Sequence, residues 1–240
     1  FSIPQARSLA NMAEKFAGSK LVATVNQNLM IPWVKENAFG NLFTELKKIN
    51  LHKAGTEEIR DITCCPGSET CNLGITASRG LVDSLNKDME NGFKPSKDLD
   101  HITIKASGCP NSCGQHHIAS IGFHGGAKKL NGILTPHYEI LLGGRVSEDK
   151  VVFGTSVIKI PAKNAPEAMK APSTIIKIIS KGKKPLENIL TGWVKAISAN
   201  YLNHSRTYPI SSYLLSPILT MAQLKSLVWK TEVKVNALEP

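Results

Sequence analysis

The 240-residue sequence predicts an α+β fold built in successive regions. Two stretches in the first 54 residues have apolar side chains at helical spacing, and short extended segments lie between them. Further along, β-type runs alternate with turns that are rich in glycine and proline. The last 38 residues match neither pattern. We therefore expect three regions, at 1–54, 55–202 and 203–240, the last being an extension that docks on this chain or on a neighbouring one.

The first region predicts a small unit of helices and strands. Its helical stretches bury one apolar face each, and Gly18 ends the first of them. Gly55 and Thr56 mark a plausible boundary, because no periodic pattern crosses them. The expected elements are a helix at 4–16, a strand at 20–26, an extended piece at 29–33 and a helix at 36–49.

The second region predicts strands that lead directly into loops containing cysteines. Glycine pairs at Gly125-Gly126 and Gly143-Gly144 are expected to turn the chain between later strands. The expected elements are strands at 59–63, 101–105, 119–123, 138–142 and 151–153, and helices at 75–89, 115–118, 165–179 and 186–202.

Four cysteines form two pairs. Five residues separate Cys65 from Cys71, and three separate Cys109 from Cys113. Thiolates from two loops can hold a four-iron cluster, because soft sulfur suits iron and each iron of the cluster takes one cysteine. The fifth cysteine, Cys64, breaks the spacing, and we interpret it as a bystander.

Structural zinc is the alternative interpretation of a four-cysteine set. Zinc ligands in a tight turn usually have about two to four residues between them, so the gap between Cys65 and Cys71 fits poorly. The spacing favours an iron–sulfur cluster and leaves zinc open. A disulfide framework is disfavoured by the odd cysteine count, and we expect a reducing compartment.

Further motifs accompany the two cysteine pairs. The second pair lies in Gly108-Cys109-Pro110-Asn111-Ser112-Cys113-Gly114. The other segments are Thr24-Val25-Asn26-Gln27-Asn28-Leu29, Pro66-Gly67, Asn72-Leu73-Gly74, Ile121-Gly122-Phe123 and Leu141-Leu142-Gly143-Gly144-Arg145. In this order and spacing they are similar to the sirohaem and iron–sulfur signature of the nitrite and sulfite reductase family. The resemblance fades after about residue 200.

The resemblance implies a ferredoxin-like half-domain at 1–54, a sirohaem and [4Fe-4S] domain at 55–202, and six-electron reduction of nitrite to ammonia or of sulfite to sulfide. It also implies that Cys113 bridges the cluster to the sirohaem iron, and that Asn111 and Gln27 face the sirohaem. The implied cluster ligands are Cys65, Cys71, Cys109 and Cys113. His116 is a candidate proton donor, because this reduction consumes protons near neutral pH.

The chain is basic, with 29 Lys and Arg residues against 19 Asp and Glu residues and a formal charge of +10. An anionic cofactor, a small anionic substrate and an acidic donor such as ferredoxin explain this excess. A nucleic-acid partner would rest on charge alone, since aromatic residues are not interleaved with the basic clusters. No apolar stretch is long enough for a membrane span, so we expect a cytoplasmic protein, with a plastid as the alternative.

Family members are about twice as long, and this chain resembles only their second half. We expect the missing half elsewhere in the polypeptide, on a partner chain, or in a second copy across a two-fold axis. The alternative function is an iron–sulfur electron-transfer or sensor subunit without catalysis of its own. Substrate choice between nitrite and sulfite, and the physiological electron donor, stay open.

Overall fold

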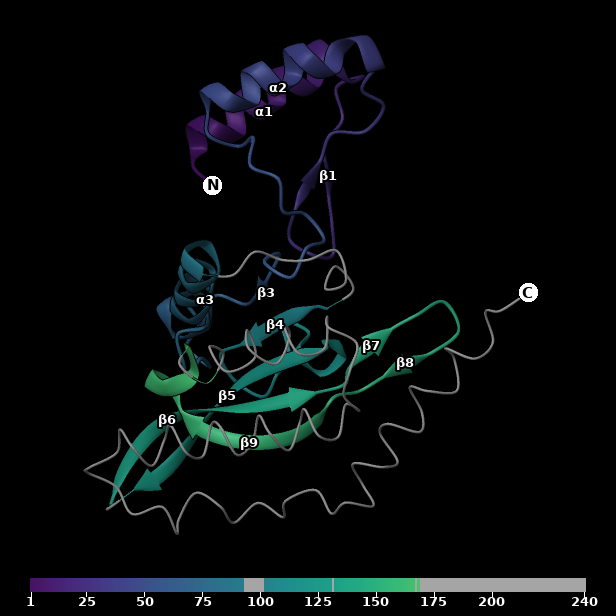
Figure 1. The fold of residues 1–240 in the computed structure, drawn as a ribbon. Helices are drawn as coiled ribbons and strands as arrows, with labels where there is room; N and C mark the ends of the chain where they lie inside the picture. The colour runs from purple at the N-terminus through teal and green to yellow at the C-terminus, as the bar shows by residue number, and fades with distance from the viewer. Residues whose placement is uncertain (93–101, 131, 167, 169–240) are drawn as a thin grey trace. The chain divides into compact units, whose positions relative to one another are not determined.

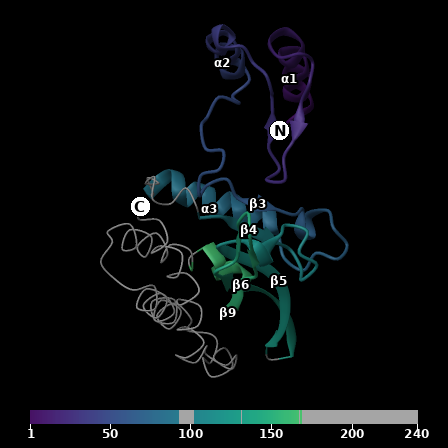
Figure 2. The same cartoon turned by 90° about the vertical axis from the view of Figure 1, so that its right-hand side faces the viewer.

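The computed structural model describes residues 1–92, 102–130, 132–166 and 168 (Figures 1 and 2). The chain forms two compact units, Phe1–Thr56 and Glu57–Pro240. The helix predicted at 186–202, most of the one predicted at 165–179 and the extension at 203–240 lie outside the described residues. In the part of the chain that is described, no helix combines the length and apolar character needed to cross a membrane.

The first unit contains the two predicted helices, which pack against each other. The buried side chains of this contact are Leu9, Met12 and Leu42. Its elements are α1 (Ile3–Phe16), β1 (Val22–Ala23), β2 (Leu29–Met30), the 3-10 turn η1 (Glu36–Ala38) and α2 (Phe39–Lys48). The strands β1 and β2 pair antiparallel and are much shorter than the predicted segments. Every side chain in these two strands is exposed. The strands therefore bury no apolar surface that would stabilise a longer pairing.

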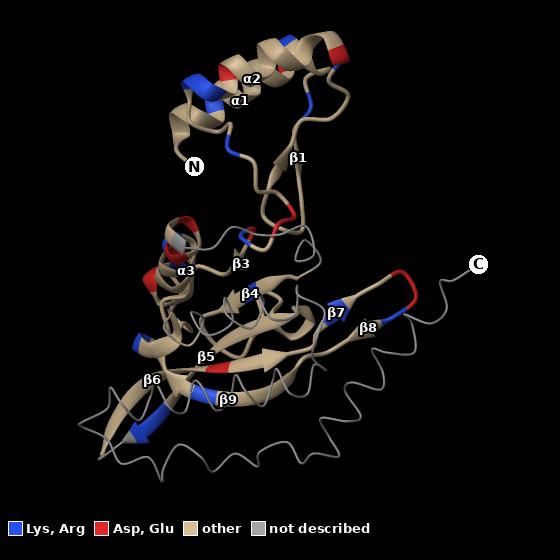
Figure 3. Cartoon of the chain, in the orientation of Figure 1, with Lys and Arg blue, Asp and Glu red and all other residues tan. Residues whose placement is uncertain are grey.

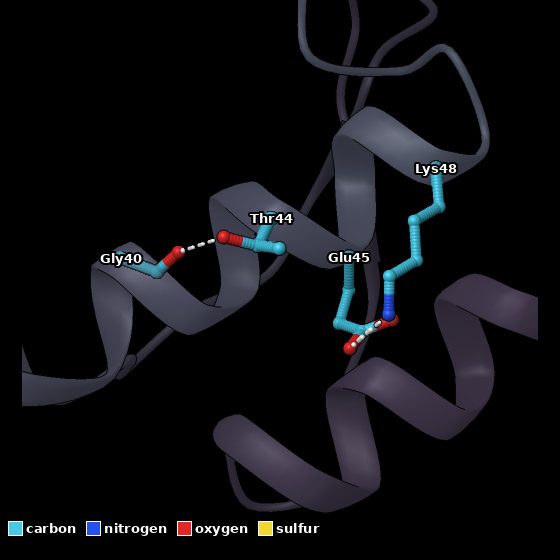
Figure 4. Close-up of polar contacts among 4 residues, drawn as sticks. All are labelled: Gly40, Thr44, Glu45 and Lys48. Carbon is cyan, nitrogen blue, oxygen red and sulfur yellow. Dashed lines mark hydrogen bonds and ion pairs between the residues drawn. The ribbon is translucent and has the colours of Figure 1, made fainter.

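Local contacts define both helices. Ser2 caps α1: its Oγ accepts from the Gln5 amide at 3.4 Å, and its own amide donates to Gln5 Oε1 at 2.7 Å. On α2, Thr44 Oγ1 donates to the Gly40 carbonyl at 2.8 Å, and Lys48 Nζ lies 2.9 Å from Glu45 Oε1 (Figure 4). These bonds join residues three or four positions apart, which are neighbours on a helix surface.

The second unit is built on a five-stranded sheet with the order β3-β4-β5-β6-β9. The first three strands run parallel, and β6 and β9 add antiparallel pairs. The strands are β3 (Thr63–Cys64), β4 (Ile104–Ser107), β5 (Ile121–Leu130), β6 (Ile133–Leu142) and β9 (Thr155–Pro161). A separate hairpin joins β7 (Arg145–Val146) to β8 (Val151–Val152).

The core of this unit lies on one face of the sheet. Helix α3 (Ser78–Gly92) contributes Leu81, Val82 and Leu85 to it and contacts β3 and β4 (Figure 1). The sheet contributes alternate residues, since successive side chains of a strand point to opposite faces. The buried residues from the strands are Ile104, Ala106, Ile121, Phe123, Tyr138, Ile140 and Ile160.

Several predicted boundaries are wrong. β3 begins four residues later than the predicted strand, and β4 is displaced toward the second cysteine loop. β5 and β6 are ten residues each, twice the predicted length, and β9 was not predicted. β9 is rich in β-branched residues and pairs along β6, so its strand identity comes from this pairing as well as from its sequence.

The predicted turn at Gly125-Gly126 is wrong for a specific reason: both glycines lie inside β5. A Cβ on Gly125 would lie 2.6 Å from the carbonyl carbon of Gly108, which belongs to the second cysteine loop. This glycine therefore permits a close approach of two backbones. The pair Gly143-Gly144 does end β6, and Gly143 has a φ of 85°, in the region that favours glycine.

Candidate cofactor site

Both cysteine loops begin at the same edge of the sheet. Cys65 directly follows β3, and Gly108 and Cys109 directly follow β4. The two strands are parallel neighbours, with Cys64 opposite Ala106. The Cys65 amide continues the ladder by donating to the Ala106 carbonyl at 3.1 Å. Because the carboxyl ends of parallel strands meet at one edge, the pairing of β3 with β4 brings together loops that are 43 residues apart in sequence.

Backbone hydrogen bonds lock one loop to the other. The amides of Ile75 and Thr76, in the first loop, both donate to the Gly108 carbonyl, at 2.8 and 3.0 Å. The Ser68 amide donates to the Thr76 carbonyl at 3.0 Å. A Cβ on Gly108 would lie 2.6 Å from the Cα of Gly67, so this packing requires glycine at the contact.

The sulfur of Cys65 sits in an environment that favours the thiolate. The Gly108 amide donates to Cys65 Sγ at 3.1 Å, and Ser78 Oγ lies 3.5 Å from the same sulfur. Ser78 has a single hydroxyl proton, and its shorter contact is with the Cys65 carbonyl oxygen, at 2.6 Å. The amide is therefore the unambiguous donor to sulfur.

The pKa of Cys65 reflects two opposing effects. Burial raises it, and hydrogen bonds from Ser78 and from the amides of Gly108, Gly67 and Cys65 itself lower it, with a net pKa below the usual range. Cys64 differs: burial, and then the neighbouring Cys65, raise the pKa of its thiol. Cys64 packs against the hydrophobic core, which agrees with its interpretation as a bystander.

The remaining predicted ligands lie on the same two loops. Cys71 is half-buried, Cys109 is buried and Cys113 is exposed, and all five cysteines of the chain are free thiols. Within the described residues, no three His, Cys, Asp or Glu side chains gather closely enough to share a single metal ion. A structural zinc ion needs four ligands around one point, whereas a [4Fe-4S] cluster takes one cysteine at each iron. Four thiols on two interlocked loops, with a backbone amide donating to one sulfur, are a donor set whose chemistry suits a cluster.

Two buried polar residues, neither of them predicted as a site residue, shape the end of the second loop. Ser107 Oγ accepts from the Gly114 amide at 3.0 Å, next to Cys113. Lys105, 6% exposed, donates to Gln115 Oε1 at 3.1 Å and to Thr63 Oγ1 at 3.3 Å. Burial lowers the pKa of Lys105, and the nearby carboxylate of Asp61 opposes that effect. Both residues lie in β4, which was predicted only as the strand that precedes the second cysteine loop.

His116 is fully buried in the short turn η4 (His116–Ile118). Its Nδ1 lies 2.9 Å from Ser107 Oγ, and its ring centroid is 4.1 Å from that of His117 and 4.8 Å from that of His124. Burial, followed by repulsion from the two neighbouring histidines, lowers the pKa of His116 to about 3. His116 is therefore a neutral imidazole at pH 7.

The two predicted sirohaem contacts belong to different units. Asn111 is exposed in the second loop, between Cys109 and Cys113. Gln27 is exposed in the first unit, at a φ of 64°. Its backbone amide donates to the Thr24 carbonyl at 3.1 Å. The turn that carries Gln27 is further held by Thr24 Oγ1, which accepts from the Asn28 amide at 3.1 Å. Both amide side chains stay predictions as sirohaem contacts.

Comparison with known protein families covers both units. Residues 55–185 match the model of the nitrite and sulphite reductase 4Fe-4S domain. Residues 1–49 match the model of the nitrite/sulfite reductase ferredoxin-like half domain. The chain belongs to the nitrite and sulfite reductase family. The family and fold class predicted from the sequence are confirmed, and this membership implies sirohaem and a [4Fe-4S] cluster as cofactors.

Relatives with curated names include three reductases. The chain is 27% identical over 159 residues to the chloroplastic ferredoxin–nitrite reductase of Zea mays, covering 65% of this chain and 27% of that protein. It is 24% identical to the ferredoxin–nitrite reductase of Synechococcus elongatus, covering 68% and 31%. It is 25% identical to the assimilatory ferredoxin-dependent nitrite reductase of Haloferax mediterranei, covering 68% and 28%. The chain thus spans about a third or less of these relatives.

Two solved structures share the fold. The NirA protein of Mycobacterium tuberculosis superposes with a TM-score of 0.59 at 22% identity, covering 71% of this chain and 31% of that one. Dissimilatory sulfite reductase I gives a TM-score of 0.56 at 11% identity, covering 71% and 59%. At these identities the likeness establishes the fold of the family and not a substrate.

Proposed function

We propose that this chain is the cofactor-bearing part of a reductase that converts nitrite to ammonia or sulfite to sulfide by six electrons. The observation that carries the proposal is the pair of interlocked cysteine loops at the carboxyl edge of β3 and β4, in a chain of this family. Such loops place thiolates on a rigid sheet, which fixes the geometry that a cluster requires.

In this proposal Cys65, Cys71, Cys109 and Cys113 would hold the cluster, and Cys113 would also hold the sirohaem iron. When bound, the two cofactors supply electron storage and a metal at which the substrate is reduced. Cys113 suits a shared role because it is the exposed thiol of the four, so a second large group can reach it. The Gly108 amide stabilises negative charge on Cys65, and it would tune the potential of a cluster held there.

Polar side chains complete the proposed site. The amides of Asn111 and Gln27 are suited to hydrogen bonds with the carboxylates of sirohaem. His116 is proposed to pass protons toward the reduction as a neutral imidazole, with Ser107 fixing its ring through Nδ1. Its depressed pKa means that it does not store a proton at neutral pH.

The proposed partners follow from charge and length. An acidic one-electron donor such as ferredoxin complements the formal charge of +10, and relatives named ferredoxin–nitrite reductases use that donor by name. The substrate is a small anion. The remainder of the reductase is proposed to come from the same polypeptide, from a partner chain or from a second copy.

The test begins with anaerobically purified protein. We expect a Soret-like band with a sharp band near the red end, about five irons per chain, and reduction of nitrite or sulfite by reduced methyl viologen. Cys113→Ser is expected to lose the sirohaem bands, and Cys64→Ser, the adjacent control, is expected to keep both cofactors. About four irons without sirohaem or turnover would favour an electron-transfer subunit, and a colourless zinc protein would overturn the proposal.

A further inference from the structure

A row of polar side chains crosses four strands of the sheet. The strand register places Ser107 of β4 opposite His124 of β5, His124 opposite Glu139 of β6, and Glu139 opposite Lys159 of β9. The adjacent row of the same strands belongs to the hydrophobic core. Since side chains alternate between faces, the polar row lies on the opposite face of the sheet.

Glu139 supplies the negative charge of this row. It is the single acidic residue within β3, β4, β5, β6 and β9, all of which the structure describes (Figure 3). Its Oε2 lies 2.9 Å from Lys159 Nζ and 3.5 Å from His124 Nε2. Burial raises the pKa of Glu139, but hydrogen bonds from Ser156 and Lys159 outweigh that effect and lower it. Glu139 is therefore an anion at neutral pH.

His124 is placed to exchange a proton with solvent. Its side chain is 16% exposed, and that of Glu139 is 18% exposed, whereas His116 is fully buried. Its Nδ1 lies 3.4 Å from the Gly125 carbonyl and its Nε2 lies 3.5 Å from Glu139 Oε2, so each ring nitrogen faces an oxygen acceptor. A ring that is protonated on both nitrogens can donate to both oxygens, and its contact with Glu139 is then charge-assisted.

The other end of the row reaches the cysteine loops. Ser107 accepts from the amide of Gly114, the residue after Cys113, and it precedes Gly108, whose amide donates to Cys65 Sγ. His116 bridges the two ends, with Nδ1 at 2.9 Å from Ser107 Oγ and its ring 4.8 Å from that of His124. The Nε2 of His116 is buried with no hydrogen-bond partner, so this ring has one nitrogen available for a passing proton.

We propose that His124, held between His116 and Glu139, binds a proton when the cluster is reduced, so that electron and proton enter this site together. The inference rests on the cluster of the proposed function and not on turnover. His124 takes one proton from solvent as one electron reaches the cluster from the one-electron donor, and it releases that proton on reoxidation. The added negative charge near Ser107 favours the imidazolium.

Other charged groups around His124 leave room for this proton. The titratable groups on this face of the sheet and on η4 are Lys105 on β4, Lys128 on β5, Glu139 and His137 on β6, Lys159 on β9, and His116 and His117. Lys159 and Glu139 form an ion pair and largely offset each other, and His116 is neutral at pH 7.

The test is the midpoint potential of the cluster in the loaded 240-residue chain, measured by redox titration between about pH 5.5 and 8.5. A proton fully coupled to one electron makes the potential fall by about 59 mV per pH unit as pH rises. We expect a sloping window in the unmodified chain and a flat line in His124→Gln. Glu139→Gln is expected to move the window to lower pH, because the neutral amide no longer stabilises the imidazolium.

His137→Gln is the matched control. His137 lies on the same face of β6, but the register places it opposite Gly126 and not opposite His124, and its Nδ1 bonds the Thr135 carbonyl at 2.8 Å, so the window should stay in place. A pH-independent potential in the unmodified chain, or a slope that persists in His124→Gln, would overturn the proposed coupling of the proton to the electron. If His124→Gln fails to hold the cluster, an unmoved window in Glu139→Gln overturns it. A chain that holds no cluster would contradict the proposed function itself.

Discussion

The amide of Gly108 donates to the sulfur of Cys65 at 3.1 Å, across 43 residues of sequence. This bond joins the end of β4 to the loop that follows β3, so the same contact that closes the two loops also stabilises a thiolate. Structure and electrostatics are therefore coupled at this point. A change that separates the loops is expected to raise the pKa of Cys65 as well as to destabilise the unit, because the donor moves away from the sulfur.

Ser78 holds the backbone at Cys65 by a hydrogen bond, and replacing Ser78 tests how much that bond contributes to stability. Its hydroxyl is fully buried and donates to the Cys65 carbonyl at 2.6 Å, at the start of α3. Ser78→Ala removes that donor, and we expect a loss of about 1–3 kcal/mol in the free energy of unfolding, measured with denaturant. The control is Ser68, an exposed serine in the loop that follows β3. Ser68→Ala should change the free energy of unfolding by less than about 0.5 kcal/mol. Equal losses in the two variants would contradict the role of this hydrogen bond.

Two adjacent glycines of β5 make a matched pair for the packing of the second loop. A Cβ on Gly125 would lie 2.6 Å from the Gly108 carbonyl carbon, whereas a Cβ on Gly126 would meet nothing within 4 Å. Gly125→Ala is expected to destabilise the chain by about 1–3 kcal/mol or more and to lower its iron content, since the loop must move. Gly126→Ala should leave both unchanged or add a few tenths of a kcal/mol. Similar iron contents in the two variants would show that the loop tolerates displacement.

Much of the fold was predictable because its periodicities are local. The stripe that includes Leu9 and Met12 identified α1, and the spacing of the cysteines identified both loops. Boundaries set by tertiary contacts were not predictable. Gly125 has the sequence signature of a turn, yet it lies inside a strand because another backbone packs against it.

The polar row shows the same limit within the site. His116 could be singled out from its place beside the cysteine motif, whereas no sequence motif singles out His124. Its partners Ser107, Glu139 and Lys159 come from three other strands, and only the strand register aligns them. Register across several strands depends on non-local pairing, which a single sequence does not specify.

Leu42 belongs to the small core of the first unit, so truncating its side chain should destabilise the two helices of that unit. This side chain is buried against Leu9 and Met12 between α1 and α2. Leu42→Ala leaves a cavity there, and we expect a cost of about 2–5 kcal/mol, with faster amide hydrogen exchange across α1 and α2. Leu29→Ala is the control, because Leu29 is exposed on β2. Unchanged exchange in Leu42→Ala would mean that this contact does not hold the two helices together.

His116 gives a prediction about acid stability with a definite sign. Its pKa is about 3 in the folded chain, against about 6.5 for an unperturbed histidine, so as pH falls below about 6.5 the unfolded chain binds this proton first. The free energy of unfolding should therefore fall with decreasing pH, by up to about 1.4 kcal/mol per unit from this residue. His116→Gln, which can keep a hydrogen bond to Ser107, should lose that part of the slope between about pH 6 and 4. His52→Gln in the first unit serves as the control. The pH slope that remains in His116→Gln includes the contribution of His137, whose pKa is also lowered, chiefly by burial. Parallel slopes for His116→Gln and the unmodified chain would show that His116 is protonated in the folded state over this range.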